Sequence, residues 1–186
     1  MDESGGALLS YGHHVEFAWL MLRAEEVLGR PPSLAHFDAI VQHALDYGFD
    51  HQRGGLHRLG FGKQAAHDTD KVWWPQAELL AALTVGLRQR RHGEQAAALE
   101  KLLRFIRTYQ ADPADGIWLD TVTAEGKPKC RAKAHPWKAG YHEVRALVKF
   151  ARAFGAPCTA AGEYTMGESW EERSPSAHGQ PRCNSS

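Results

Sequence analysis

The stretch Lys71-Val72-Trp73-Trp74-Pro75-Gln76-Ala77-Glu78 leads directly into the apolar run Leu-Leu-Ala-Ala-Leu at residues 79–83. It predicts an aliphatic helix that begins with two indoles and a carboxylate. Residues four apart share a helix face, so Trp74 and Glu78 project together. An indole stacks on the apolar face of a sugar ring, and a carboxylate accepts hydrogen bonds from its hydroxyls. The pair indicates a sugar site, although this segment alone also fits two core tryptophans and a solvated Glu78.

The predicted helix at residues 71–90 has helical neighbours on both sides. Apolar residues recur at three- and four-residue spacing over residues 13–28, 34–47, 93–109 and 138–154, and Ser33 is a plausible cap for the second of these. Residues 50–62 and 116–133 carry glycines among nearly alternating apolar residues, which predicts short hairpins or extended loops. From residue 156 onward Gly, Ser, Pro, Glu and Arg dominate without apolar periodicity, so we expect a disordered tail over 156–186.

The composition excludes several classes of function. The 22 basic residues balance the 22 acidic ones, which argues against a nucleic-acid or membrane-surface partner. No apolar stretch approaches the roughly 20 residues of a membrane span, and no signal-peptide layout is present, so we expect a cytoplasmic protein. The histidines lack the His-x-x-x-His spacing of a helical zinc site, carboxylates do not cluster in the sequence, and the three cysteines are scattered. We therefore expect no metal and no cofactor.

Two further segments resemble the first in their chemistry. Residues 12–19, Gly-His-His-Val-Glu-Phe-Ala-Trp, place His13, Glu16 and Trp19 at successive three-residue intervals, so neighbours in this series share a helix face. Residues 135–145, His-Pro-Trp-Lys-Ala-Gly-Tyr-His-Glu-Val-Arg, again combine indole, imidazole and charge at a loop-to-helix junction. All three segments open helices, so we expect them to converge on one end of a helical bundle.

These motifs resemble the N-acylglucosamine 2-epimerase superfamily, which also contains cellobiose 2-epimerases and aldose–ketose isomerases. Residues 11–19 look most like the cellobiose 2-epimerase form of the first motif. Residues 72–78 are similar to the tryptophan–glutamate helix of the family, and residues 137–142 to its closing histidine motif. The order and approximate spacing agree from about residue 8 to 155.

The resemblance implies an all-α fold, an (α/α)6 barrel of which residues 1–155 form only the C-terminal half, with short β-hairpin loops. It implies that His13 and His142 are the acid/base pair, and that Glu16 and Glu78 orient them or the sugar hydroxyls. Trp19, Trp74 and Trp137 line the pocket by the same resemblance. An arginine that contacts the sugar comes from the other half of the family barrel, and no segment here takes that role by motif.

The residue types suit inversion at the carbon next to the carbonyl of an open-chain aldose, N-acylated amino sugar or disaccharide reducing end. This reaction needs a proton removed from one face and returned to the other, and two imidazoles can do both near neutral pH. Returning the proton to C1 instead gives a ketose, as in a mannose isomerase. A third alternative is an inactive relative that acts as a binding protein. We expect poor activity from a half-barrel alone, and an N-terminal half or a homo-oligomer to cover its exposed helices.

Overall fold

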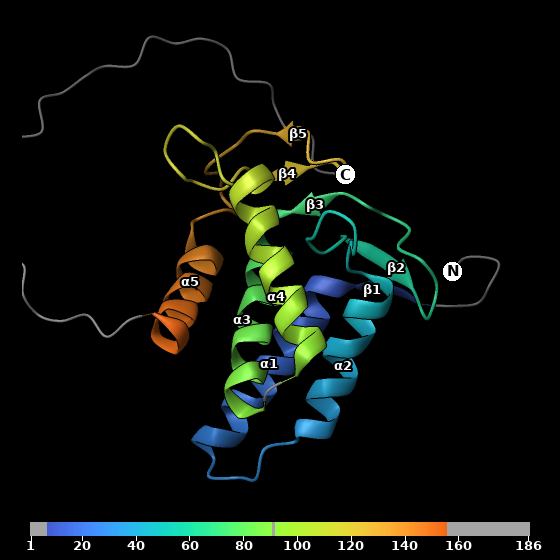
Figure 1. Cartoon of the computed structure of the whole chain (residues 1–186), viewed down its shortest axis with the longest axis vertical. Helices are drawn as coiled ribbons and strands as arrows, with labels where there is room; N and C mark the ends of the chain where they lie inside the picture. The colour runs from blue at the N-terminus through green and yellow to red at the C-terminus, as the bar shows by residue number, and fades with distance from the viewer. Residues whose placement is uncertain (1–6, 91, 156–186) are drawn as a thin grey trace, which may run out of the picture.

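The structure is a computed structural model, and it describes residues 7–90 and 92–155. Helices dominate these ranges (Figure 1). They are α1 (Tyr11–Val27), α2 (Leu34–Tyr47), α3 (Trp73–Gln89), α4 (Gly93–Phe105), whose last turn continues as the π-helix η1 (Ile106–Gln110), and α5 (Tyr141–Phe154).

Helix α3 forms the centre of the molecule because it is apolar on nearly every side. Residues 75–84 are all buried, including the charged Glu78. A helix that is hydrophobic all round needs neighbours all round, and α3 packs against α1, α2, α4 and α5. Gly86 allows a close approach, since a Cβ there would come within 2.8 Å of the Phe37 ring.

The helices alternate in direction. Helices α1, α3 and α5 begin at the end of the molecule where the strands lie, whereas α2 and α4 begin at the opposite end and run back (Figure 1). Helices α1 and α5 flank α3, and α2 packs on α1 while α4 packs on α3. The first turns of α1, α3 and α5 are therefore brought to one end, as the three motifs predicted.

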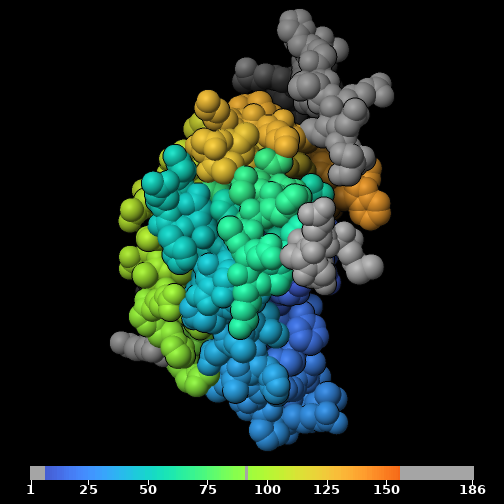
Figure 2. Space-filling view, turned by 90° about the vertical axis from the view of Figure 1, so that its right-hand side faces the viewer, coloured from blue at the N-terminus to red at the C-terminus, as the bar shows by residue number. Residues whose placement is uncertain are grey.

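Short strands and loops cover the end where these helices begin, above α1 and α2 (Figure 2). Strand β1 (Leu8–Ser10) pairs antiparallel with β2 (Leu59–Phe61), and β3 (Lys71–Val72), β4 (Thr121–Val122) and β5 (Pro128–Cys130) form a second antiparallel sheet in the order β3-β4-β5. The hairpin predicted over 116–133 is thus confirmed. The segment 50–62 forms a loop, which is one of the two forms predicted for it. A bridge between Phe49 and Leu56 closes this loop, and its last residues pair with β1.

Buried ion pairs hold these loops on the helices. Lys71 is fully buried, and its Nζ donates to Asp50 Oδ2 at 2.7 Å and to the Gly54 carbonyl at 2.8 Å. Lys138 is also buried and bonds to Glu143 in the first turn of α5. Each lysine therefore fixes a loop next to a helix that begins at the same end of the molecule.

Some predicted boundaries differ from the structure. Ser33 does not cap α2 with its side chain; its N–H and hydroxyl donate instead to Glu25, the former at 2.7 Å. Helix α5 begins at Tyr141 rather than Lys138, because Gly140, with φ of +75°, departs from the helical conformation just before it.

The predicted tail over 156–186 and residues 1–6 lie outside the described residues. None of the helices in the described ranges combines the length and apolar composition that a membrane crossing requires.

Candidate active site

Trp74 packs near both predicted acid/base histidines at the end where α1, α3 and α5 begin. The centroid of its ring system lies 4.6 Å from that of His13, in the first turn of α1, and 5.8 Å from that of His142, in the first turn of α5. Trp74 is partly exposed and His13 is exposed. Three segments far apart in the sequence thus bring an indole and two imidazoles together at an accessible surface.

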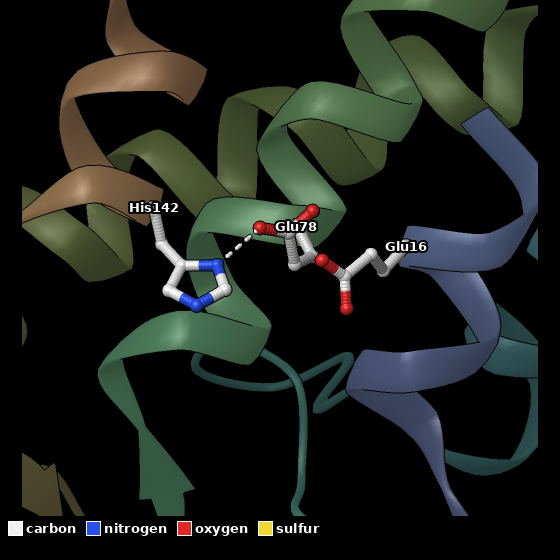
Figure 3. Close-up of side chains that lie close together, drawn as sticks. All are labelled: Glu16, Glu78 and His142. Atoms are coloured by element: carbon white, nitrogen blue, oxygen red, sulfur yellow. Dashed lines mark hydrogen bonds and ion pairs between the residues drawn. The ribbon is translucent and has the colours of Figure 1, made fainter. Parts of the chain in front are cut away.

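Glu78 lies one turn beyond Trp74 on α3 and is fully buried. Its carboxylate accepts a hydrogen bond from Trp19 Nε1 at 2.8 Å and contacts His142 Nδ1 at 2.6 Å, and the Arg145 guanidinium donates to the same oxygen as His142. Figure 3 shows the His142 ring facing Glu78 from α5, with Glu16 approaching from α1. The alternative of a solvated helix charge at Glu78 is therefore wrong.

The surroundings of Glu78 decide its charge. Burial alone would raise the pKa of the Glu78 carboxyl, but the hydrogen bonds from His142 and Trp19 and the positive charge of Arg145 outweigh it and hold the pKa below its ordinary value. An ionised carboxylate only accepts hydrogen bonds, so Nδ1 of His142 carries the proton in this contact. In the neutral imidazole the lone pair is then on Nε2, which can accept a proton from a substrate.

Arg145 belongs to this cluster, although the sequence motifs did not single it out. Besides its bond to Glu78, it contacts Glu16 Oε1 at 3.4 Å, and its Cζ lies 4.7 Å from the Trp19 ring centroid and 4.3 Å from that of Tyr141. Burial would lower the pKa of Arg145, but the charge of Glu78 raises it above its ordinary value. Its position three residues after His142, on the same helix face, was the one available signal.

Glu16, Glu78 and His142 each place one potential ligand atom within 4.8 Å of the others. The sequence showed no such cluster, because its members lie on three separate helices. The set has the dimensions of a small metal site, but the Arg145 guanidinium bonds to both carboxylates and so fills the place of a cation. The described geometry is that of an ion-pair network.

Trp19 and Trp137, both expected to line the pocket, differ from each other in exposure. Trp19 is 3% exposed, and its ring contacts Arg145 and also Lys149, whose Nζ is 4.4 Å from the centroid. It therefore supports the position of Glu78. Trp137 is 85% exposed in the turn between His135 and Lys138, and its backbone N–H donates to His135 Nδ1 at 3.2 Å. Substrate contacts by these two tryptophans stay predictions.

Two neighbouring histidines have other contacts. The His14 ring lies 6.1 Å from that of His43, and burial together with His43 and His13 lowers the pKa of His14. Adjacent residues on a helix diverge by about 100°, and His14 accordingly packs near His43 whereas His13 packs near Trp74. The His135 Nε2 lies 2.8 Å from Asp120 Oδ2, and its ring packs edge-on against Trp73, so His135 anchors the loop before α5.

Comparison with known families agrees with this arrangement. The family model for N-acylglucosamine 2-epimerase (GlcNAc 2-epimerase) matches residues 5–146, which contain all three motifs. This chain belongs to the N-acylglucosamine 2-epimerase family. The resemblance read from the motifs is confirmed.

Curated proteins similar to this chain include named enzymes. A cellobiose 2-epimerase of Bacteroides fragilis is 28% identical over 149 residues, which are 76% of this chain and 37% of that protein. A mannose-6-phosphate isomerase of Rhizobium meliloti is 29% identical over 131 residues, 65% of this chain and 32% of that protein. The solved cellobiose 2-epimerase of Bacillus thermoamylovorans B4167 superposes with a TM-score of 0.71 at 28% identity, covering 81% of this chain and 39% of that one.

The chain therefore spans between 32% and 39% of the length of these relatives. The expected all-α architecture is confirmed, since the solved neighbours are (α/α)6 barrels and this chain matches about two fifths of each.

Proposed function

We propose that this chain supplies the two proton-transferring histidines, His13 and His142, of a carbohydrate 2-epimerase. The observation that supports this most is the grouping of His13 and His142 around Trp74, with Nδ1 of His142 bound to the ionised Glu78. Membership of a family of sugar epimerases and isomerases agrees with it. The substrate class is an aldose, an N-acylated amino sugar or the reducing end of a disaccharide.

The proposed reaction begins with the open-chain aldose. One imidazole removes the proton from C2, the C2–H electron pair moves toward the carbonyl, and an enediolate forms; the other imidazole returns a proton to the opposite face of C2. His142 takes or gives its proton through Nε2, because Nδ1 is held by Glu78. The carboxylate stabilises the imidazolium that forms, as a second group does for many catalytic histidines. Each histidine alternates between acid and base, so the cycle consumes no cofactor.

The other site residues bind the sugar in this proposal. Trp74 is partly exposed and supplies an indole surface beside both histidines. Glu16 accepts hydrogen bonds from hydroxyls near the mouth, and Arg145 orients Glu16 and Glu78. Trp137, on the exposed turn before α5, contacts a more distant part of the ligand.

The complete activity is proposed for the complete barrel. The described helices account for the two histidines, while the relatives have more than twice as much chain. We expect the 186-residue chain alone to epimerise sugars poorly, because helices that would close the other side of the site are not among those described.

An aldose–ketose isomerase is the second candidate, and the relative named mannose-6-phosphate isomerase favours it. The same two imidazoles would transfer the C2 proton to C1. The test is product analysis by NMR after this chain is joined to the preceding helices of the Bacteroides fragilis relative and supplied with cellobiose, N-acetylglucosamine or mannose. A C2-epimeric aldose supports the first candidate and a ketose the second. If neither forms while a sugar still binds, the protein is a non-catalytic binding protein.

A further inference from the structure

One carboxylate oxygen, Oε1 of Glu78, is shared by two donors on α5. His142 Nδ1 lies 2.6 Å from this oxygen, and the Arg145 guanidinium, one helical turn further on, donates to it as well. Trp19 Nε1 donates to the other oxygen, Oε2, at 2.8 Å. The imidazole therefore shares its acceptor with a group that is positively charged at every pH at which a histidine titrates.

Arg145 is held in this position by groups on two helices. Its Cζ lies 4.3 Å from the ring centroid of Tyr141 and 4.7 Å from that of Trp19, and its Nη2 donates to Glu16 Oε1 at 3.4 Å. Its side chain is 22% exposed, so solvent screens its charge only in part. The positive charge is thus fixed beside the two carboxylates rather than free to move into solvent.

The charges around His142 do not cancel without Arg145. Groups that carry or can carry a charge near His142 come from α1, α3, the loop before α5 and α5 itself, and they are His13, Glu16, Glu78, Lys138, Tyr141, Glu143, Arg145 and Lys149. Glu143 is bonded to Lys138, and Lys149 Nζ lies 4.4 Å from the ring centroid of Trp19. Glu16 and Glu78 place two negative charges beside the imidazole (Figure 3), and Arg145 bonds to both.

This arrangement bears on the protonation of His142. A nearby carboxylate favours the doubly protonated imidazolium, whereas a nearby cation disfavours it. The doubly protonated ring has no lone pair and cannot accept a proton from C2 of a sugar. We propose that Arg145 keeps the His142 ring singly protonated near neutral pH, so that Nε2 is free to accept the sugar proton. The inference rests on the proposed function. Arg145 acts through Glu78 and is therefore a positioning residue.

Two substitutions of Arg145 separate this effect of charge from a merely structural one. A structural role requires hydrogen bonds that hold the carboxylates, and the neutral amide of Arg145→Gln can still donate such bonds. The proposed role requires a positive charge, which Arg145→Lys retains and Arg145→Gln lacks. A structural role predicts that neither variant changes the protonation of His142 systematically, whereas the proposed role predicts a change in the Gln variant that Lys restores.

NMR of the histidine ring nitrogens in the 186-residue chain, followed from pH 5 to 9, measures this directly. Loss of signals in His142→Asn identifies the ring. In Arg145→Gln the pH at which His142 takes up its second proton should rise by about one unit or more, the usual effect of a neighbouring charge. Arg145→Lys should stay near wild type. Arg152→Gln, exposed and about 10 Å further along α5, is the matched control and should also stay there.

A second pair of variants serves if Arg145→Gln does not fold, since it leaves two carboxylates without their cation. Glu16→Gln removes one of these carboxylates, and the combination of Glu16→Gln with Arg145→Gln should take up the second proton of His142 about one pH unit above Glu16→Gln alone. No upward change on loss of Arg145, or an equal rise in Arg145→Lys or Arg152→Gln, would overturn the proposal.

The NMR readout involves no sugar, so failures of the two proposals can be told apart. If the change in His142 appears but a completed barrel exchanges no proton at C2 of a sugar, the proposed function fails. If a completed barrel exchanges that proton but loss of Arg145 leaves the protonation of His142 unchanged, the role assigned to Arg145 fails and the proposed function stands.

Discussion

His142 and Glu78 are joined by an Nδ1···Oε1 contact of 2.6 Å although 64 residues separate them in the sequence. The contact links the first turn of α5 to the buried side of α3. It fixes which ring nitrogen of His142 carries the proton, and it leaves Nε2 for chemistry. Each prediction about the site depends on this pair or on the residues that hold it in place.

Replacing Glu78 with Gln should destabilise the fold. The amide cannot neutralise Arg145, and the bonds from Trp19 and His142 lose their charged acceptor. Loss of charged hydrogen bonds around a buried group typically costs about 2–4 kcal/mol of unfolding free energy. Urea denaturation measures this. Glu100→Gln, at an exposed position on α4, is the control and should change little. Equal stability of both variants would contradict the assigned role of Glu78.

Acid should weaken the wild-type fold through the same carboxylate. The pKa of Glu78 is lowered in the folded state, so near the ordinary glutamate value of about 4.3 the unfolded chain binds more protons. Its contribution is present above that pH and is lost as pH falls through the lower, folded pKa. Urea midpoints from pH 7 to 3 should fall less steeply for Glu78→Gln. Asp50, also lowered in pKa, keeps part of the acid sensitivity in that variant. Identical slopes would show that Glu78 is not held ionised.

Gly12→Ala should disturb the packing of Trp74 against the first turn of α1. A Cβ at Gly12 would lie 2.6 Å from the Trp74 ring and 2.9 Å from Pro75. Alanine normally stabilises a helix by about 1 kcal/mol relative to glycine, but overpacking of this kind costs about 1–3 kcal/mol, so the sign should reverse. Thermal unfolding and tryptophan fluorescence report the effect. Gly93→Ala, with open space around its Cβ, should be neutral or stabilising; equal behaviour of the two would argue against close packing at Gly12.

The buried pair of Lys138 and Glu143 should stabilise the start of α5. Lys138→Met alone leaves a buried carboxylate without its partner, which typically costs about 3–5 kcal/mol. The double variant, which combines Lys138→Met with Glu143→Leu, removes both charges and should recover much of that loss. Chemical denaturation of the single and double variants measures the difference. A double variant less stable than the single one would mean that the pair does not act as a unit.

Periodicity and motif order predicted much of the fold. Helices α1 to α5 were located within a few residues, because their apolar residues recur at helical spacing, and convergence of His13, Trp74 and His142 followed from their shared place in first turns. The hydrogen bond from Arg145 to Glu78 could not be predicted, since the two residues are 67 positions apart and meet only because α5 packs on α3. The predicted capping of α2 by Ser33 was wrong for a local reason. Its hydroxyl bonds to Glu25 of the preceding helix instead of the backbone of α2.

Substitutions of Trp74 and His142 should impair different steps in a completed barrel, which is made by joining this chain to the preceding helices of the Bacteroides fragilis relative. Trp74→Phe keeps part of the stacking surface, so it should mainly weaken sugar binding and leave proton exchange measurable. Substrate titration followed by fluorescence or NMR gives the affinity. Loss of exchange with unchanged affinity would instead place Trp74 in the chemistry.

The most direct test of the two-histidine account is deuterium incorporation at C2 of the sugar in heavy water, followed by NMR in the same completed barrel. His142→Asn keeps a hydrogen-bonding side chain beside Glu78 but cannot transfer the proton. The account predicts a loss of incorporation of about 10²–10⁴-fold, the usual contribution of a proton-transfer group. Undiminished incorporation in the His142→Asn variant would contradict it, because His13 alone would then have to serve both faces of C2.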